Sequence, residues 1–209
     1  MRKSNLITIM LLLAATLFIS SCIGDGDDTT INTAAQKQYQ SQMSGTYNGK
    51  AYFIQSSAAK ANDSTTTIVW RLSSDSIITV ANFPVSSYAK DINDSTSNIS
   101  ELKALKTALK SAPNQTVKLL YGVPSTSYVT STYINFVVNP YSISFDLTYD
   151  GATHNIIIPF QWNYCLGTYT ISTGYASLVM LASGIYIDKT SYSTYFTSTY
   201  TYLFASSKY

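Results

Sequence analysis

Apolar and polar residues alternate most regularly between positions 141 and 162. Two runs place an apolar or aromatic residue, and in one case a histidine, at every second position: Tyr141, Ile143, Phe145, Leu147 and Tyr149, then His154, Ile156, Ile158, Phe160 and Trp162. Asp150-Gly151 separates the runs, and this pair readily adopts the positive φ angles of a tight turn. The pattern predicts a β-hairpin with one face in the core.

Other segments are rich in β-branched and aromatic residues and are bounded by turn-forming residues, as is typical of strands. We expect strands at 44–53, 65–72, 76–83, 116–121, 133–138, 168–173, 177–188 and 197–204. The prolines agree with these boundaries, because a missing backbone N–H costs least near the end of an element. They are Pro84, Pro113, Pro124, Pro140 and Pro159.

One segment has a helical period instead. Its apolar residues recur every three or four positions, at Ile99, Leu102, Leu105, Leu109 and Ala112. Asn98 or Ser100 can cap its start, and Pro113 ends it. The pattern predicts an amphipathic helix near 99–112 that covers a sheet end or a barrel mouth. Residues 34–43 are compatible with a second, short helix.

These elements predict a mainly β, single-domain protein, either an antiparallel β-sandwich or a closed barrel, with one amphipathic helix. Gly45-Thr46-Tyr47 is similar to the first strand of lipocalin-like domains, and Gly167-Thr168-Tyr169 repeats the motif. This resemblance implies a lipocalin-like barrel. The strand pattern by itself leaves the sandwich open.

The first residues have the pattern of an export signal. Arg2 and Lys3 precede an apolar run at 6–19, which is shorter than the roughly twenty residues that a membrane-spanning helix needs. Ile19-Ser20-Ser21-Cys22 resembles the lipobox of bacterial lipoproteins, in which the cysteine is acylated and becomes the first residue of the mature chain. The resemblance implies that residues 1–21 are a signal peptide and that Cys22 anchors the protein to a membrane.

An acidic stretch follows the cysteine. Gly24-Asp25-Gly26-Asp27-Asp28 resembles the export signal with which lipoproteins of Bacteroidetes reach the outer face of the outer membrane. The resemblance implies a cell-surface location, with attachment at the periplasmic face as the alternative. Residues 22–36 show no apolar period and are interpreted as a flexible acidic tether, which leaves 37–209 as the β-rich domain.

The charge of the chain bears on its partners, and its cysteine content bears on disulfide formation. Loss of Arg2 and Lys3 with the signal peptide reduces the 13 basic residues to the number of acidic ones, 11, so the mature chain is formally neutral. Neutrality gives no electrostatic reason to expect a nucleic-acid partner. With Cys22 acylated, Cys165 is the single remaining thiol, and no intramolecular disulfide can form.

Candidate catalytic residues are sparse. His154 is the only histidine, so a multi-histidine metal site cannot be built. A glycosidase needs two paired carboxylates, and nothing pairs Glu101, the only glutamate and on the exposed side of its helix, with Asp146 or Asp150 of the hairpin. His154 and Cys165 are eight or nine extended steps apart on the predicted strand, too far for a nucleophile pair unless the chain folds back. We therefore predict a non-enzymatic domain without a metal or another cofactor.

Tyrosines are the most distinctive residues of the domain. Fourteen of the 18 lie from Tyr121 onwards, and several alternate with serine or threonine. A tyrosine ring offers a flat apolar face and a polar tip, which suits stacking on sugar rings, although tyrosine is also a good strand former. The candidate binding residues are Tyr192, Tyr195, Tyr200 and Tyr202.

Four Asp-Ser or Asp-Thr sequences resemble the O-glycosylation motif of exported Bacteroidetes proteins. The residues that would carry the glycan are Thr29, Ser64, Ser76 and Ser95. Turn chemistry is the alternative explanation for these sequences. If the four residues are modified, they must be accessible to solvent.

The lipobox, the acidic tether and the Ser/Thr/Tyr-rich β-domain together resemble uncharacterised lipoprotein families of Bacteroidetes, domains of unknown function of about 200 residues. We expect a non-catalytic surface lipoprotein whose domain binds a carbohydrate, an envelope component or a protein. The alternatives are a structural or assembly subunit of an envelope complex and a barrel that carries a small apolar ligand.

Overall fold

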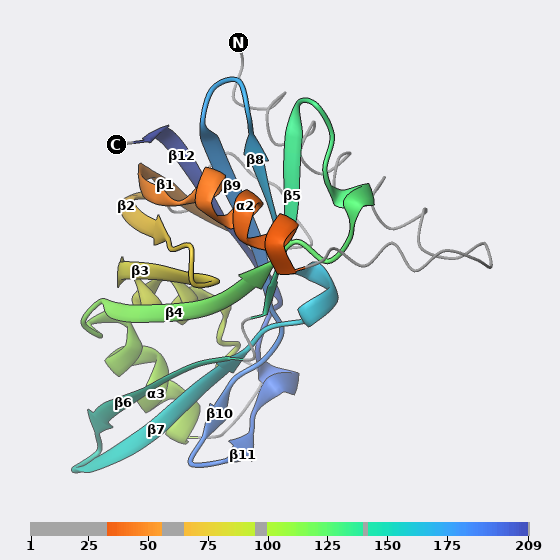
Figure 1. The fold of residues 1–209 in the computed structure, drawn as a ribbon. Coiled ribbons are helices and arrows are strands. Elements are labelled where there is room, and N and C mark those ends of the chain that lie inside the picture. The colour runs from red at the N-terminus through yellow and green to blue at the C-terminus, as the bar shows by residue number, and fades with distance from the viewer. Residues whose placement is uncertain (1–32, 56–64, 95–99, 140–141, 209) are drawn as a thin grey trace, which may run out of the picture. The chain divides into compact units, whose positions relative to one another are not determined.

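The computed structural model describes residues 33–55, 65–94, 100–139 and 142–208 (Figure 1). Two α-helices lie in these ranges, α2 (Thr33–Met43) and α3 (Ser100–Lys110). The strands are β1 (Gly45–Gln55), β2 (Thr65–Leu72), β3 (Ile77–Phe83), β4 (Gln115–Gly122), β5 (Tyr133–Asn139), β6 (Ser142–Tyr149), β7 (Ala152–Pro159), β8 (Leu166–Thr170), β9 (Tyr175–Ala182), β10 (Tyr186–Ile187), β11 (Thr190–Ser191) and β12 (Thr199–Lys208). Four short 3₁₀ helices connect them: η1 (Val85–Asp91), η2 (Thr126–Tyr128), η3 (Trp162–Tyr164) and η4 (Ser193–Tyr195).

Eight strands close into a barrel in the order β1-β2-β3-β4-β5-β8-β9-β12, and β12 pairs with β1 again. All eight neighbouring pairs are antiparallel, and each strand pairs with the next barrel strand along the chain. This is the up-and-down order of lipocalin-type barrels. The predicted β class and the barrel alternative are confirmed. The sandwich alternative is wrong, because the last barrel strand completes the ring instead of leaving two open sheets.

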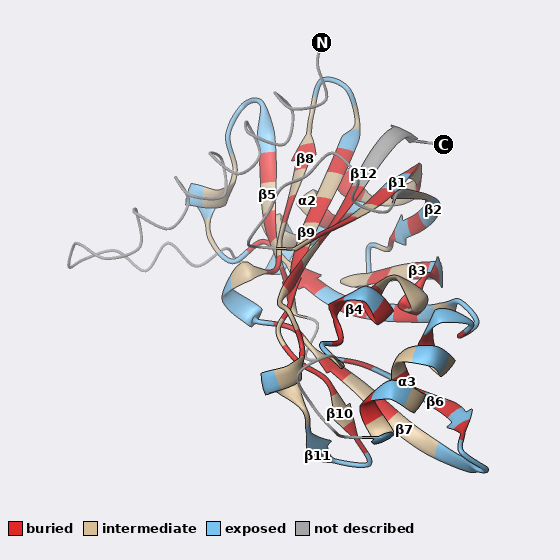
Figure 2. Ribbon diagram, turned by 180° about the vertical axis from the view of Figure 1, so that it is seen from behind, coloured by how far each residue is buried: buried red, intermediate tan, exposed pale blue. Residues whose placement is uncertain are grey.

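The barrel encloses the core. Burial alternates along its strands, so that one residue in two faces inwards, as in Ile134, Phe136 and Val138 of β5 (Figure 2). Tyr47 stacks on Trp70 with ring centroids 5.0 Å apart, and both rings are fully buried. The protein's own aromatic side chains therefore occupy the interior, which argues against the interior as the site of a small apolar ligand.

Different segments cover the two ends of the barrel. At the start of β1, the Tyr47 hydroxyl donates to the Met43 carbonyl of α2, and the Gln40 amide of α2 donates to Ser76 Oγ over 2.6 Å. At the other end of β1, the Tyr88 ring of η1 packs edge-on against Phe53, with ring centroids 5.4 Å apart. Helix α2 and η1 thus cover the core at opposite ends of β1.

The chain leaves the barrel twice, and the two excursions pair with each other in a second sheet of order β11-β10-β7-β6. The turn between β6 and β7 has positive φ at Asp150 (48°) and Gly151 (78°), which confirms the predicted hairpin. Its apolar face is buried as expected, at Ile143, Phe145, Leu147 and Tyr149. Helix α3, buried at Leu102, Leu105 and Leu109, packs against η1 and β6, so it covers the second sheet.

One predicted strand is divided in the structure. The segment 177–188 forms the end of β9 and all of β10, with a break at residues 183–185. The pairing partner changes there from β12 of the barrel to β7 of the second sheet. A side chain on Gly184 would overlap the side chain of Ser193, so this crossing requires a residue without a Cβ.

Candidate functional site

The four candidate tyrosines separate into two groups. Tyr200 and Tyr202 lie on β12, whereas Tyr192 and Tyr195 lie at η4. On β12 the inward residues are Thr199, Thr201 and Leu203, all fully buried. Because side chains alternate across a strand, Tyr200 and Tyr202 point to the outside of the barrel.

A short helical turn extends this outer aromatic surface. The backbone N–H of Gln161 donates to the Leu181 carbonyl over 2.9 Å, and Leu181 pairs with Tyr200. This bond places η3 beside β9 and β12, where the Tyr164 ring meets Tyr200 with centroids 6.4 Å apart. Tyr200 in turn neighbours Tyr202, with centroids 6.0 Å apart. We call Trp162, Tyr164, Tyr200 and Tyr202 the aromatic row.

Accessibility falls along the aromatic row. Trp162 is 77% exposed, Tyr164 and Tyr200 are half-buried, and Tyr202 is only 6% exposed. Figure 2 draws much of η3 in the pale blue of exposed residues. Burial, and secondly the neighbouring Tyr164, raise the pKa of Tyr200, and burial raises the pKa of Tyr202 to about 12. Tyr202 is therefore largely covered, and the surface open to a partner is formed by Trp162, Tyr164 and Tyr200.

The sequence pattern pointed to Tyr200 and Tyr202 but not to the two aromatic residues of η3. It assigned Trp162 to the end of a strand, which in the structure ends at Pro159. The available signal was the local sequence Gln161-Trp162-Asn163, in which a large aromatic residue stands between two polar amides directly after a proline-terminated strand.

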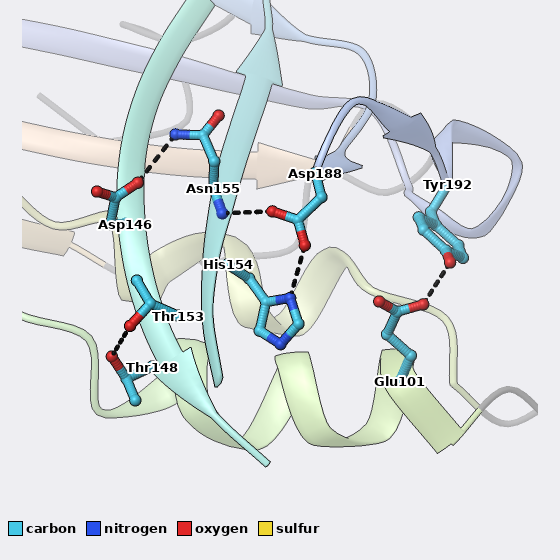
Figure 3. Close-up of polar contacts among 8 residues, drawn as sticks. All are labelled: Glu101, Asp146, Thr148, Thr153, His154, Asn155, Asp188 and Tyr192. Atoms are coloured by element: carbon cyan, nitrogen blue, oxygen red, sulfur yellow. Dashed lines mark hydrogen bonds and ion pairs between the residues drawn. The ribbon is translucent and has the colours of Figure 1, made fainter. Parts of the chain in front are cut away.

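Tyr192 and Tyr195 have other neighbours. The Tyr192 hydroxyl donates to the Glu101 carboxylate of α3, a bond that raises the pKa of Tyr192 (Figure 3). The helical pattern predicts Glu101 on the exposed side of the helix, but in the structure it is half-buried where it meets Tyr192. The Tyr195 carbonyl accepts the Asn93 N–H over 2.7 Å, and its ring packs partly against the core. These two tyrosines thus attach η4 to the rest of the domain.

A polar cluster lies on the second sheet (Figure 3). Asp188 accepts the Asn155 backbone N–H and contacts His154 Nδ1, each over 2.8 Å. These two hydrogen bonds, the Asn155 bond first, hold the pKa of Asp188 below its usual value. The His154 ring also stacks on Tyr149 with centroids 4.2 Å apart. Asp188 has a positive φ of 49°, so the cluster fixes a strained turn between β10 and β11 to β7.

The thiol of Cys165 has no part in this cluster. Cys165 is fully buried, and its Sγ donates to the Gln161 carbonyl over 3.2 Å. Burial raises its pKa to about 12, so the group is a neutral thiol at physiological pH. His154 contacts Tyr149 and Asp188 instead, and the structure shows no Cys–His pairing.

Of the remaining sequence-predicted sites, Ser76 is the one within the described residues. Cys22, Thr29, Ser64 and Ser95 lie outside them. Ser76 is half-buried in the turn before β3, with φ of 65°, and its hydroxyl accepts the Gln40 amide. A glycan on Ser76 would replace this bond between the turn and α2.

Two features are absent from the described ranges. No group of three or more histidine, cysteine, aspartate and glutamate side chains is placed to hold a metal ion there. Within the same ranges, no helix is long and apolar enough to cross a membrane.

Comparison with known sequences gives a family but no activity. Residues 42–187 match the model of a domain of unknown function, DUF4840, which spans β1 to β10 and includes Trp162 and Tyr164. Searches among curated proteins and among solved structures found no match. Because the match covers more than half of the chain, the protein belongs to the DUF4840 family.

Proposed function

We propose that this protein is a lipid-anchored protein of the outer membrane surface and that its barrel is a non-catalytic binding module. The anchor rests on Cys22 and the lipobox around it, and the surface location on the acidic residues that follow. Acyl chains contribute roughly 0.8 kcal/mol per buried methylene, so two or three of them hold a protein without a transmembrane segment.

The binding role rests on one observation, the exposure of Trp162 at the end of the aromatic row. Trp162 keeps 77% of its surface accessible although it is the largest side chain type, while the other tryptophan, Trp70, is 1% exposed. Exposed aromatic residues are typical of recognition surfaces, because they bury a large area at a small entropic cost. Trp162 belongs to the same helical turn as Tyr164, whose ring meets Tyr200.

A non-catalytic role is supported by the environment of the candidate nucleophile and base. Cys165 is buried with a raised pKa, and His154 is engaged by Asp188 and Tyr149. His154 lies on β7 of the second sheet, and Cys165, which directly follows Tyr164, has its thiol buried and bonded to the Gln161 carbonyl. The row offers flat apolar faces and hydroxyl groups, which can bind but cannot transfer protons efficiently near neutral pH.

Labelling with palmitate tests the lipid anchor, and protease accessibility tests the predicted cell-surface location. Cells that express the full chain should incorporate labelled palmitate into it, and Cys22→Ser should abolish the incorporation. On intact cells, protease should digest the domain, whereas a variant with Asp25, Asp27 and Asp28 changed to alanine should be protected. Equal protection of both chains would place the domain inside the envelope and contradict the surface location.

A different observation favours the alternative role as an assembly subunit. Leu120 on the outer face of β4 is 55% exposed, and the half-buried Ile77 of β3 lies directly opposite. If this patch packs against an envelope protein, cross-linking should yield a partner in stoichiometric amount, and Leu120→Lys should remove it. An unchanged cross-linked product in the variant would exclude this patch as the interface.

A further inference from the structure

The ligand class can be inferred from the chemistry around the aromatic row. We propose that the row, together with the side chains of Gln161 and Asn163, binds an uncharged polysaccharide. This inference rests on the proposed binding function of the same surface.

The first observation is the pair of amides beside Trp162. Gln161 and Asn163 are both exposed, and neither side chain forms a hydrogen bond with the described residues. Each amide has donors and an acceptor, so it can bind two neighbouring hydroxyl groups at once. An aromatic face flanked by two such amides can bind a sugar ring by its apolar face and by its hydroxyl edge.

The second observation is the absence of charge. The row is supplied by two segments, 155–187 and 190–207, and the sequence of each contains no aspartate, glutamate, lysine or arginine. On the barrel surface, Tyr200 is flanked by Ile54 and Leu181, and Tyr202 by Tyr52 and Val179. Lys50 of β1 is exposed and pairs with Phe204, so a cation lies beyond the Tyr202 end of the row. At the rings themselves, a charged polymer would lose hydration without gaining an ion pair, which a neutral polymer avoids.

The third observation is the continuity of the row. Trp162 and Tyr164 belong to one helical turn, and the rings of Tyr164, Tyr200 and Tyr202 follow at centroid separations of 6.4 and 6.0 Å. Each separation is comparable to the size of one sugar ring. Because Tyr202 is only 6% exposed, a chain of several sugar units would contact Trp162, Tyr164 and Tyr200, whereas a single sugar would contact only one or two of them.

A protein partner fits these features less well. Protein interfaces are enriched in arginine as well as in aromatic residues, and charged groups usually form their rim. Neither segment that supplies the row contains an arginine or any acidic residue. The uncharged surface and the amides without partners favour a hydroxyl-rich, neutral ligand.

Affinity electrophoresis of the full chain tests the inference. The protein is purified in a mild detergent that has no sugar headgroup and is run in native gels that contain dextran, mannan, a β-glucan, starch or, as a charged comparison, alginate. We expect at least one neutral polysaccharide to retard the chain and alginate to have no effect. Trp162→Ala should weaken the binding at least tenfold, and the double variant Gln161→Ala, Asn163→Ala should also weaken it.

Tyr175→Ala is the matched control. Tyr175 is 49% exposed and lies at the opposite end of β9 from Leu181, about 20 Å away at 3.3 Å per residue. This variant should bind like the unchanged chain. Equal urea midpoints of the two aromatic variants would confirm that Trp162→Ala has not simply unfolded the domain. Binding that survives Trp162→Ala would overturn the inference.

Intrinsic fluorescence gives an independent readout. Because Trp70 is buried, acrylamide should quench mainly Trp162, and a bound neutral polysaccharide should reduce that quenching. If none of the neutral polysaccharides binds, or if alginate binds through Trp162, the inferred ligand class is wrong. A photo-cross-linking residue at position 162 then separates the proposed binding function from the inferred ligand class. Capture of an envelope protein would keep the binding function and refute the polysaccharide as its ligand. No capture would refute both proposals.

Discussion

A methyl group on Gly167 should disrupt the barrel core. Gly167 of β8 lies directly opposite Phe136 of β5, and the Phe136 ring covers the space that a side chain would occupy. In Gly167→Ala the new Cβ would lie within 3.0 Å of three ring carbons, where ordinary contacts begin at 3.4 Å. The ring must therefore retreat by roughly 1 Å, although it is fully buried and packs edge-on against Tyr121.

Such overpacking typically reduces the free energy of unfolding by about 1–3 kcal/mol, and the complete burial of Phe136 favours the upper half of that range. Urea unfolding followed by tryptophan fluorescence measures the loss as a lower midpoint with an unchanged slope. A thermal midpoint about 4–10 °C lower should accompany it.

A double-mutant cycle with Phe136→Leu isolates the clash. The smaller leucine leaves space for the alanine methyl, so the double variant should be more stable than the sum of the two single effects predicts, by about 1 kcal/mol or more. Two results would refute the packing of Phe136 on Gly167. One is a free energy of unfolding of Gly167→Ala within about 0.5 kcal/mol of that of the unchanged chain, and the other is additivity of the two changes.

Three further perturbations test other contacts. Tyr88→Phe removes the hydroxyl that bonds Thr201 Oγ1 over 2.7 Å in the core, and the urea midpoint should fall by the equivalent of about 1–2 kcal/mol; an unchanged midpoint would contradict this bond. Asp188 has a folded-state pKa below its usual 3.8, because it accepts the Asn155 N–H, so its ionised form stabilises the fold above that pH. Asp188→Asn should therefore lower stability at neutral pH, and the difference should vanish as the pH falls through the depressed pKa; a difference that grows in acid would reverse the argument. Finally, in a folded chain that carries Cys22→Ser, Cys165 should resist a disulfide reagent at pH 8, and it should react once urea unfolds the chain; rapid reaction of the folded chain would contradict its burial.

Most individual elements could be predicted from local patterns. The strand at 65–72 and the helix near 99–112 match β2 and α3 closely, and Asp150-Gly151 forms the expected turn. These predictions succeeded because apolar periodicity, turn formers and prolines act within a few residues. The candidate site was predicted only in part, since Tyr200 lies on the aromatic row but Tyr192 serves to attach η4 to α3.

The sequence by itself determined the class of each segment, because alternation, helical period and turn chemistry are local properties of the chain. Only the tertiary structure decided between sandwich and barrel, since closure depends on the pairing of β1 with β12, about 150 residues away along the chain. It likewise decided which tyrosines share a surface. Tyr164 and Tyr200 come together because the chain leaves the barrel after β5 and after β9 and re-enters it beside β9, an arrangement that no local pattern encodes.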